Sequence, residues 1–175
     1  MEVGSNISLF FRIFGLAYHN AVLDKFMIFN AQYLIFATFL LVVLLALFGS
    51  AKEKKSTILA FIGLIIAEVL TRIIHGFYFE PRPFVTYDIA PLIKHAVDAA
   101  FPSGHTTVMA VTAWSFTFYK SRFAPLLLIL MLIVGFARIF IGVHYPFDII
   151  GGIVLGFISV AAGWQIKNWL FKILF

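Results

Sequence analysis

The sequence contains no cysteine, which excludes a disulfide framework, a thiolate nucleophile and a cysteine-bound metal. Charged residues are also scarce, at 12% of the 175 residues, whereas hydrophobic residues make up 62% and the mean hydropathy is +1.03. Soluble domains carry about 25% charged residues on average. The scarcity of charge therefore indicates that a lipid bilayer surrounds most of the chain.

The basic balance of the chain, a formal net charge of +5, does not indicate a nucleic-acid partner. The basic residues are dispersed among long apolar runs and form no continuous stripe, so anionic lipid of the inner leaflet is the better explanation. We find no internal repeat and no low-complexity linker, and we predict one domain over residues 1–175. The sequence does not indicate an oligomeric state.

Long apolar stretches predict the fold class. A helix needs roughly 20 apolar residues to cross the hydrocarbon core, and about five candidates meet this criterion. We predict an all-α, polytopic transmembrane helical bundle whose spans are 29–49, 57–79, 106–119, 123–143 and 147–170. The segment 1–28 mixes apolar and polar residues without the features of a signal peptide, so we expect an interfacial helix there and a helical core over 29–175.

Lysines and arginines in the loops predict the orientation. They gather in AKEKK at 51–55, in YKSR at 119–122 and at Lys167 and Lys172, which five spans place on one side of the membrane. The positive-inside rule makes that side cytoplasmic. The amino terminus then lies on the outer face.

Three polar clusters interrupt the apolar sequence: EPRPF at 80–84, FPSGHTT at 101–107 and RIFIGVHYPFD at 138–148. All three fall on the predicted outer face, although the topology was deduced from other residues. Together they hold arginines, histidines, an aspartate and a Ser-Gly turn, which are suited to holding a phosphate and attacking it.

The third cluster carries His144 and Asp148, four residues apart. In a helix they share one face, where the carboxylate can bond one imidazole nitrogen and leave the other exposed as a nucleophile. Pro146 suits the first turn of the helix that follows. The alternative is an interfacial histidine beside an aspartate that caps the helix.

The two arginines are candidate phosphate ligands. Arg138 lies near the outer end of the fourth span, where a cation usually has a partner or a ligand, although it could also extend its side chain to the interface. Arg82 lies between Pro81 and Pro83, which stiffen the backbone that carries the guanidinium. A plain external turn is the alternative.

The second cluster predicts an anion nest. Ser103 and Gly104 precede a helix, so their amides and the hydroxyl can bind an anion, with His105 beside them as a proton donor. Helix capping by Ser103 is an alternative that does not exclude this role. Outside the three clusters, the outer loop offers only Asp88 and Asp98 as carboxylates, so we predict no metal site.

The three clusters resemble, in order and spacing, the signature motifs of the type 2 phosphatidic acid phosphatase superfamily. The stretch FEPRPF, the small size and HNAVLDKFM at 19–27 resemble bacterial undecaprenyl-diphosphate phosphatases of the BcrC type. This resemblance implies a bacterial inner-membrane enzyme that needs no cofactor, acts on a lipid phosphate and faces outward. The expected reaction converts undecaprenyl diphosphate to undecaprenyl phosphate.

The resemblance also implies residue roles. His144 would attack phosphorus and form a phosphohistidine, Asp148 would orient it, and His105 would protonate the leaving oxygen. The implied phosphate ligands are Arg82, Ser103, Gly104, Arg138 and His75. Open alternatives are a broad phosphatidic acid or phosphatidylglycerol-phosphate phosphatase, a lipid phosphotransferase, and a non-enzymatic protein that binds lipid headgroups.

The chain departs from the family pattern at two positions. His75 stands where the first motif usually has a lysine, and Ala137 stands where the third usually has a serine. Arg72, Lys94 and His95 are further candidates for the missing contact. Glu68, four residues before Arg72, instead favours a structural Glu68–Arg72 ion pair.

Overall fold

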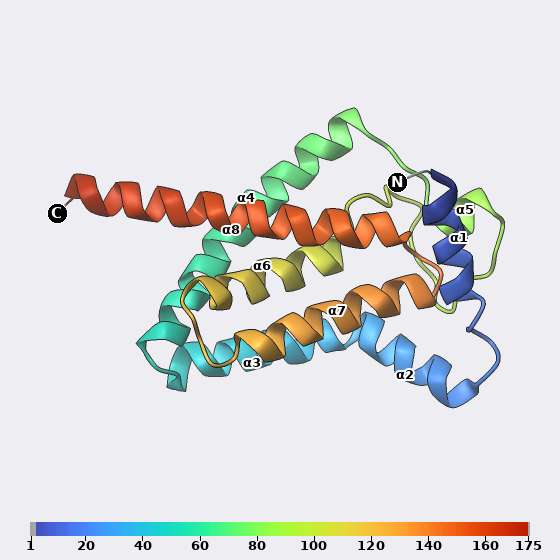
Figure 1. The fold of residues 1–175 in the computed structure, drawn as a ribbon, viewed down its shortest axis with the longest axis horizontal. Helices are drawn as coiled ribbons and strands as arrows, with labels where there is room; N and C mark the ends of the chain where they lie inside the picture. Colours follow the sequence, from blue (N-terminus) through green and yellow to red (C-terminus); the bar gives the residue numbers. More distant parts are fainter. Residues whose placement is uncertain (1–2, 175) are drawn as a thin grey trace.

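The computed structural model describes residues 3–174, with side chains described for residues 4–167. Within these limits every regular element is a helix, which confirms the all-α prediction. The helices are α1 (Val3–Phe14), α2 (Ala21–Gln32), α3 (Leu34–Phe48), α4 (Ala51–Phe77), α5 (Pro83–Thr86), α6 (Gly104–Phe118), α7 (Ala124–Phe140) and α8 (Pro146–Leu174). Figure 1 shows α1, α5 and the connection between α5 and α6 gathered at the end where α8 begins.

Among the described residues, two helices are long and apolar enough to cross a membrane: α4, with a mean hydropathy of 2.2 over an 18-residue window, and the part Pro146–Lys167 of α8, with 1.9 over such a window. α2 and α3 together make a third candidate, although they are bent by 47° at the break between them. α7 is apolar but has only 17 residues. The chain is thus a multi-pass helical membrane protein.

Side chains cap the starts of two helices. α2 begins at Ala21, since Asn20 accepts hydrogen bonds from the amides of Val22 (2.9 Å) and Leu23 (3.1 Å). α4 begins at Ala51, within a segment treated as a loop, because Ser50 and Glu53 form a capping box. The predicted spans 29–49 and 57–79 therefore start inside longer helical segments, and the first is broken between Gln32 and Leu34.

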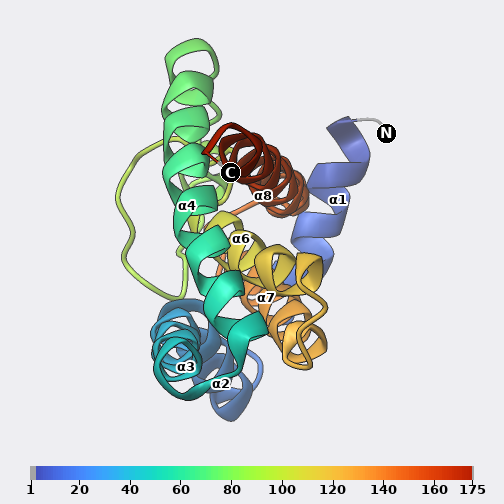
Figure 2. The ribbon, with the colours of Figure 1, turned by 90° about the vertical axis from the view of Figure 1, so that its left-hand side faces the viewer.

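α6 forms the centre of the bundle. It packs against α4, α7 and α8, which surround it in Figure 2. Small residues allow the contact with α8, because a Cβ on Gly156 would lie 2.5 Å from Cβ of Ala110, and one on Gly152 would lie 2.9 Å from the carbonyl oxygen of Ser103. The glycines of α8 therefore allow α6 and α8 to approach closely.

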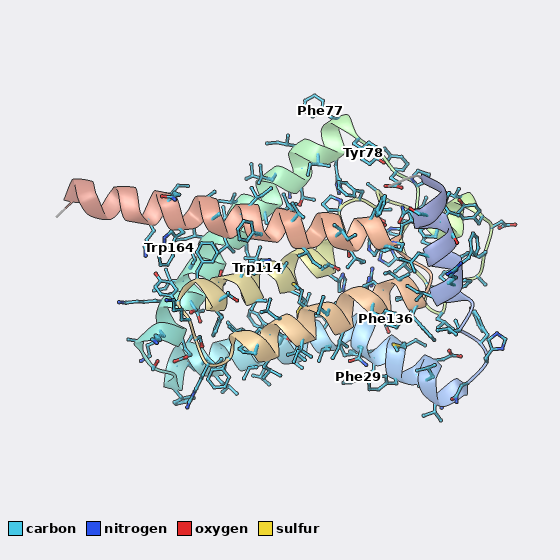
Figure 3. The ribbon with its side chains drawn as sticks, viewed as in Figure 1. Phe29, Phe77, Tyr78, Trp114, Phe136 and Trp164 are labelled. Carbon is cyan, nitrogen blue, oxygen red and sulfur yellow. The ribbon has the colours of Figure 1, made fainter. Side chains whose placement is uncertain are left out.

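Large apolar side chains cover much of the outer surface. Phe36, Phe39 and Phe61 are each about two-thirds exposed, and Phe77, at the end of α4, is 90% exposed and points away from the bundle (Figure 3). Such a surface would destabilise a protein in water but suits contact with lipid tails.

α1 docks onto the end of the bundle where α8 begins. Phe10 is fully buried, and its ring lies 5.4 Å from the ring of Tyr145. The amide of Phe147 donates a hydrogen bond to Oδ1 of Asn6 (3.0 Å). The first helix thus holds the start of the last one.

The basic segments lie at the opposite end, which holds the turn from α3 to α4 and the turn from α6 to α7 (Figure 1). There the ammonium of Lys167 donates to the hydroxyl of Tyr119 (2.9 Å) and lies 3.9 Å from the ring centroid of Trp164. Lys172 lies outside the residues whose side chains are described, as do residues 1–2 of the predicted interfacial segment.

Candidate active site

The turn between α7 and α8 positions His144. Gly142 has a φ of +86°, a conformation that residues with a Cβ rarely adopt. A Cβ there would also lie 2.8 Å from the ring of Phe14. α8 then begins at Pro146, as predicted, and its first turn carries Asp148.

Asp148 fixes the orientation of His144. Oδ2 of Asp148 accepts from the amide of Tyr145 (2.8 Å) and lies 3.2 Å from Nδ1 of His144. Both side chains are buried, with 1% of His144 and none of Asp148 exposed. Because a carboxylate oxygen accepts, Nδ1 carries the proton and Nε2 presents its lone pair. Oδ1 of Asp148 has no hydrogen-bond partner among the residues that the structure describes.

Arg82 lies directly against this imidazole. Its Nη1 is 3.0 Å from Nε2 of His144 and donates to the carbonyl of Val143 (2.9 Å). On the other side, Nε donates to Oδ1 of Asp98 (2.7 Å) and Nη2 donates to the carbonyl of Ala99 (3.3 Å). The first polar cluster is thereby joined to the third, although 62 residues separate Arg82 from His144.

Arg138 is the second buried cation, with 2% of its surface exposed. Its Nη2 lies 2.8 Å from Nε2 of His95, and its Nε has no hydrogen-bond partner among the described residues. His95 was predicted only as one of several further phosphate contacts, and the contact between Asp98 and Arg82 was not predicted. The loop that carries both residues has no periodic pattern from which these contacts could have been found.

The second polar cluster is hydrogen-bonded to the first turn of α8, which carries Asp148. Ser103 is fully buried, and its amide donates to the carbonyl of Asp148 (3.0 Å). Its hydroxyl oxygen accepts from Oγ1 of Thr106 (3.1 Å) and does not cap α6. Around Gly104 there is open space, because a Cβ built there meets nothing within 4 Å. His105, the next residue, is half-buried.

The surroundings of the site shift the pKa values of three groups that lie outside the helices: His144, His95 and Asp98. Burial, followed by repulsion from Arg138 and Arg82, lowers the pKa of His144 well below its usual range. Burial and the same two arginines lower the pKa of His95. For Asp98, burial would raise the pKa, but the hydrogen bond and the charge of Arg82 outweigh it and the pKa is lowered. At neutral pH both imidazoles are therefore neutral and Asp98 is ionised.

Two of the predicted candidates on α4 have other partners. Nε2 of His75 lies 3.1 Å from the carbonyl oxygen of Phe101. Nε of Arg72 donates to Oε1 of Glu68 (2.6 Å), which confirms the predicted ion pair. Among the described residues, no three or more His, Asp or Glu side chains are grouped so that they could hold a metal ion.

An apolar groove of about 610 Å³ reaches one of the site residues. It is lined by α3, α4 and α6, and His105 is the only ionisable residue in its lining among those described. The helical spacing of Phe61 and Leu64 places them on the same face of α4 as Glu68 and Arg72. The groove leads from the lipid-facing side of the bundle to the PSGH segment, because its lining includes both the exposed Phe36 and Phe39 and the half-buried His105.

The model of the PAP2 superfamily matches residues 56–172 of this chain. The chain belongs to this superfamily and is a membrane phosphatase, which confirms the family predicted from the three motifs. It is 40% identical over 153 residues to undecaprenyl-diphosphatase BcrC of Bacillus subtilis (strain 168), and the match covers 87% of this chain and 79% of that relative.

Two further proteins are similar over most of the chain. The putative undecaprenyl-diphosphatase YbjG of Escherichia coli (strain K12) is 31% identical over 142 residues, which cover 79% of this chain and 72% of that relative. The crystal structure of Aquifex aeolicus LpxE has a TM-score of 0.77 and 25% sequence identity, and the superposition covers 91% of this chain and 94% of that one.

Proposed function

We propose that this phosphatase hydrolyses undecaprenyl diphosphate to undecaprenyl phosphate and inorganic phosphate, with a phosphohistidine at His144 as the intermediate. The observation that carries the proposal is the line of contacts from Asp148 to Nδ1 of His144 and from Nε2 to Arg82. This arrangement places Nε2 of His144, a neutral and nucleophilic nitrogen, beside the cation of Arg82, which can bind phosphoryl oxygens. The names of the two similar relatives support this substrate.

The proposed reaction has two steps. The lone pair of Nε2 of His144 attacks the terminal phosphorus, and the bond from phosphorus to the bridging oxygen breaks. His105 donates a proton to that oxygen, which leaves as part of undecaprenyl phosphate. A water molecule, deprotonated by the now neutral His105, then attacks phosphorus, the bond to nitrogen breaks, and inorganic phosphate leaves.

Charge stabilisation is assigned to the groups around Nε2. The N–H of Arg82 that faces His144 would donate to a phosphoryl oxygen once the substrate lies beside Nε2, and the buried Nε of Arg138, which has no partner among the described residues, is available to another. Ser103 and the amide of Gly104 would hold further oxygens at the start of α6. His75, tied to the PSGH segment through Phe101, remains a proposed ligand of the outer part of the diphosphate.

The apolar groove is the proposed site of the lipid tail. Its end at His105 would place the bridging oxygen of the diphosphate near the proton donor, while the tail lies between α3 and α4. A substrate dissolved in the bilayer would then enter sideways and would not have to leave the membrane.

The proposed topology has five spans in a single domain, formed by α2 with α3, α4, α6, α7 and α8, with α1 at the outer interface. It places the site on the outer face of the bacterial inner membrane. The location of the basic segments at the opposite end of the bundle supports this orientation.

Phosphate release from undecaprenyl diphosphate by the purified protein in detergent with EDTA tests the proposal. We expect release by the wild type and by the surface variant His19→Ala, and no release by His144→Ala or His105→Ala. Turnover of phosphatidic acid or phosphatidylglycerol phosphate alone would disprove the substrate and keep the chemistry. Undiminished release by His144→Ala would disprove the phosphohistidine.

A further inference from the structure

The connection between α5 and α6 contributes two side chains to the site that belong to none of the three polar clusters. His95 contacts Arg138, and Asp98 contacts Arg82. His95 and Asp98 also lie close to each other, with 3.8 Å between Nδ1 and Oδ1. We call these two residues the arginine clasp.

Asp98 and its neighbour hold one edge of the Arg82 guanidinium. Nε donates to Oδ1 of Asp98, and Nη2 donates to the carbonyl of Ala99. The opposite edge faces Val143 and His144 through Nη1. Since a guanidinium is planar and rigid, fixing one edge fixes the direction of the other. The clasp therefore determines how Arg82 faces Nε2 of His144.

His95 holds Arg138 in a different way. Nδ1 of His95 lies 3.1 Å from the carbonyl of Ala96, so it is the protonated nitrogen and Nε2 is an acceptor. Nη2 of Arg138 donates to this acceptor at 2.8 Å. An imidazolium has no lone pair and would repel the guanidinium, so the contact requires a neutral His95.

We propose that His95 and Asp98 are positioning residues, which hold the guanidiniums of Arg138 and Arg82 in the directions that bind the transferred phosphoryl group. This inference rests on the proposed function, in which both arginines hold that group. Asp98 also offsets the repulsion between two cations that would otherwise face each other in a buried site.

Substitutions of Asp98 test the first half of the clasp, with Asp88→Asn as the matched control because it removes the same charge from an exposed position of the same loop. We expect kcat/KM to fall about 10-fold in Asp98→Asn, which keeps one acceptor oxygen, and about 100-fold in Asp98→Ala. Inhibition by inorganic phosphate should weaken in the same order. Equal kcat/KM in Asp98→Ala, Asp88→Asn and the wild type would overturn the proposal.

The pH profile of kcat/KM tests the second half of the clasp, which is the contact of His95 with Arg138. If His95 only anchored the loop, its substitution would not change this profile. The lowered pKa of His95 sets the sign: the residue is neutral above that pKa, and activity is lost as the pH falls through it. Charges that face His95 come from Arg82, Arg138 and Asp98, with the imidazoles of His105 and His144 nearby.

His95→Gln keeps a neutral acceptor but cannot titrate. We expect its acid limb to move to lower pH than that of the wild type, while the limb of His19→Gln, the histidine control, stays in place. His95→Asn serves as the second variant if His95→Gln does not fold. An acid limb of His95→Gln that matches that of the wild type would overturn the proposal. So would a wild-type activity that rises as the pH falls, if the activity of His95→Gln does not rise.

The assays use whichever of undecaprenyl diphosphate, phosphatidic acid and phosphatidylglycerol phosphate the wild type hydrolyses, so a wrong substrate does not affect the test. If the wild type hydrolyses none of them, the proposed function has failed. The clasp is then tested by stabilisation with inorganic phosphate alone, which should raise the thermal midpoint of the wild type more than that of Asp98→Ala. Equal stabilisation would overturn it.

Discussion

Two buried carboxylates lie at opposite ends of the bundle, and their partners differ. Glu53, 3% exposed, accepts from the amide of Ser50 (2.9 Å), from the hydroxyl of Ser50 and from the hydroxyl of Ser121 (2.7 Å), so both of its oxygens have donors. Asp148 is fully buried, yet only Oδ2 has donors and Oδ1 has none among the described residues.

The difference separates a carboxylate that holds the fold together from one that belongs to the proposed active site. A buried polar atom without a partner costs stability, and such costs concentrate where function requires them. Glu53 closes the start of α4 and ties it to the turn before α7, whereas Asp148 keeps His144 in one tautomer at a cost to stability.

The largest expected effect comes from Asp148→Asn. An amide in place of the carboxylate no longer favours the proton on Nδ1 of His144, so we expect kcat to fall about 10²- to 10⁴-fold. The thermal midpoint should stay the same or rise, because the desolvated charge is removed. Phosphate release and a thermal melt of the same preparation measure both. A kcat within threefold of the wild type would contradict the assigned role.

Glu53→Gln should have the opposite effect, because we expect it to lower stability and leave kcat unchanged. The loss of charge-assisted hydrogen bonds is expected to lower the free energy of unfolding by about 1–3 kcal/mol. kcat should not change, because the residue lies at the far end of the bundle. Denaturation in mixed micelles, with Lys54→Gln as a neighbouring surface control, measures the loss. A drop in kcat without a loss of stability would show that the two ends are coupled.

Ser121→Ala should have the smallest effect, because it removes one of the donors to Glu53. We expect a loss of about 1 kcal/mol in the free energy of unfolding. In Glu53→Gln the same substitution should cost less, since contacting residues are not additive. A double-mutant cycle gives the coupling energy, and full additivity would mean that the 2.7 Å contact does not stabilise the fold.

The sequence was sufficient for features that depend on composition or on local spacing. The position of α7 was predicted closely, because a long apolar run whose only charge is Arg138 identifies a membrane-length helix. The contact between His144 and Asp148 was also predicted from their spacing of four residues, although His144 lies just before α8 and not within it.

Contacts between distant residues were not predictable in this way. Asp98 is 16 residues from Arg82, and His95 is 43 residues from Arg138, so tertiary packing of an irregular loop decides both contacts. The role of Glu53 was missed for another reason. Ser50 and Glu53 have the spacing of a capping box, but the segment was interpreted only through its charge.

The contact between Asn6 and Phe147 has a consequence for the order of assembly. These residues are separated by 141 positions, so α1 cannot complete its docking until the start of α8 has left the ribosome. Until then, Phe10 lacks its contact with Tyr145, and α1 has α7 but not α8 to pack against. A chain that stops before residue 147 would therefore present an α1 that is only partly attached to the bundle.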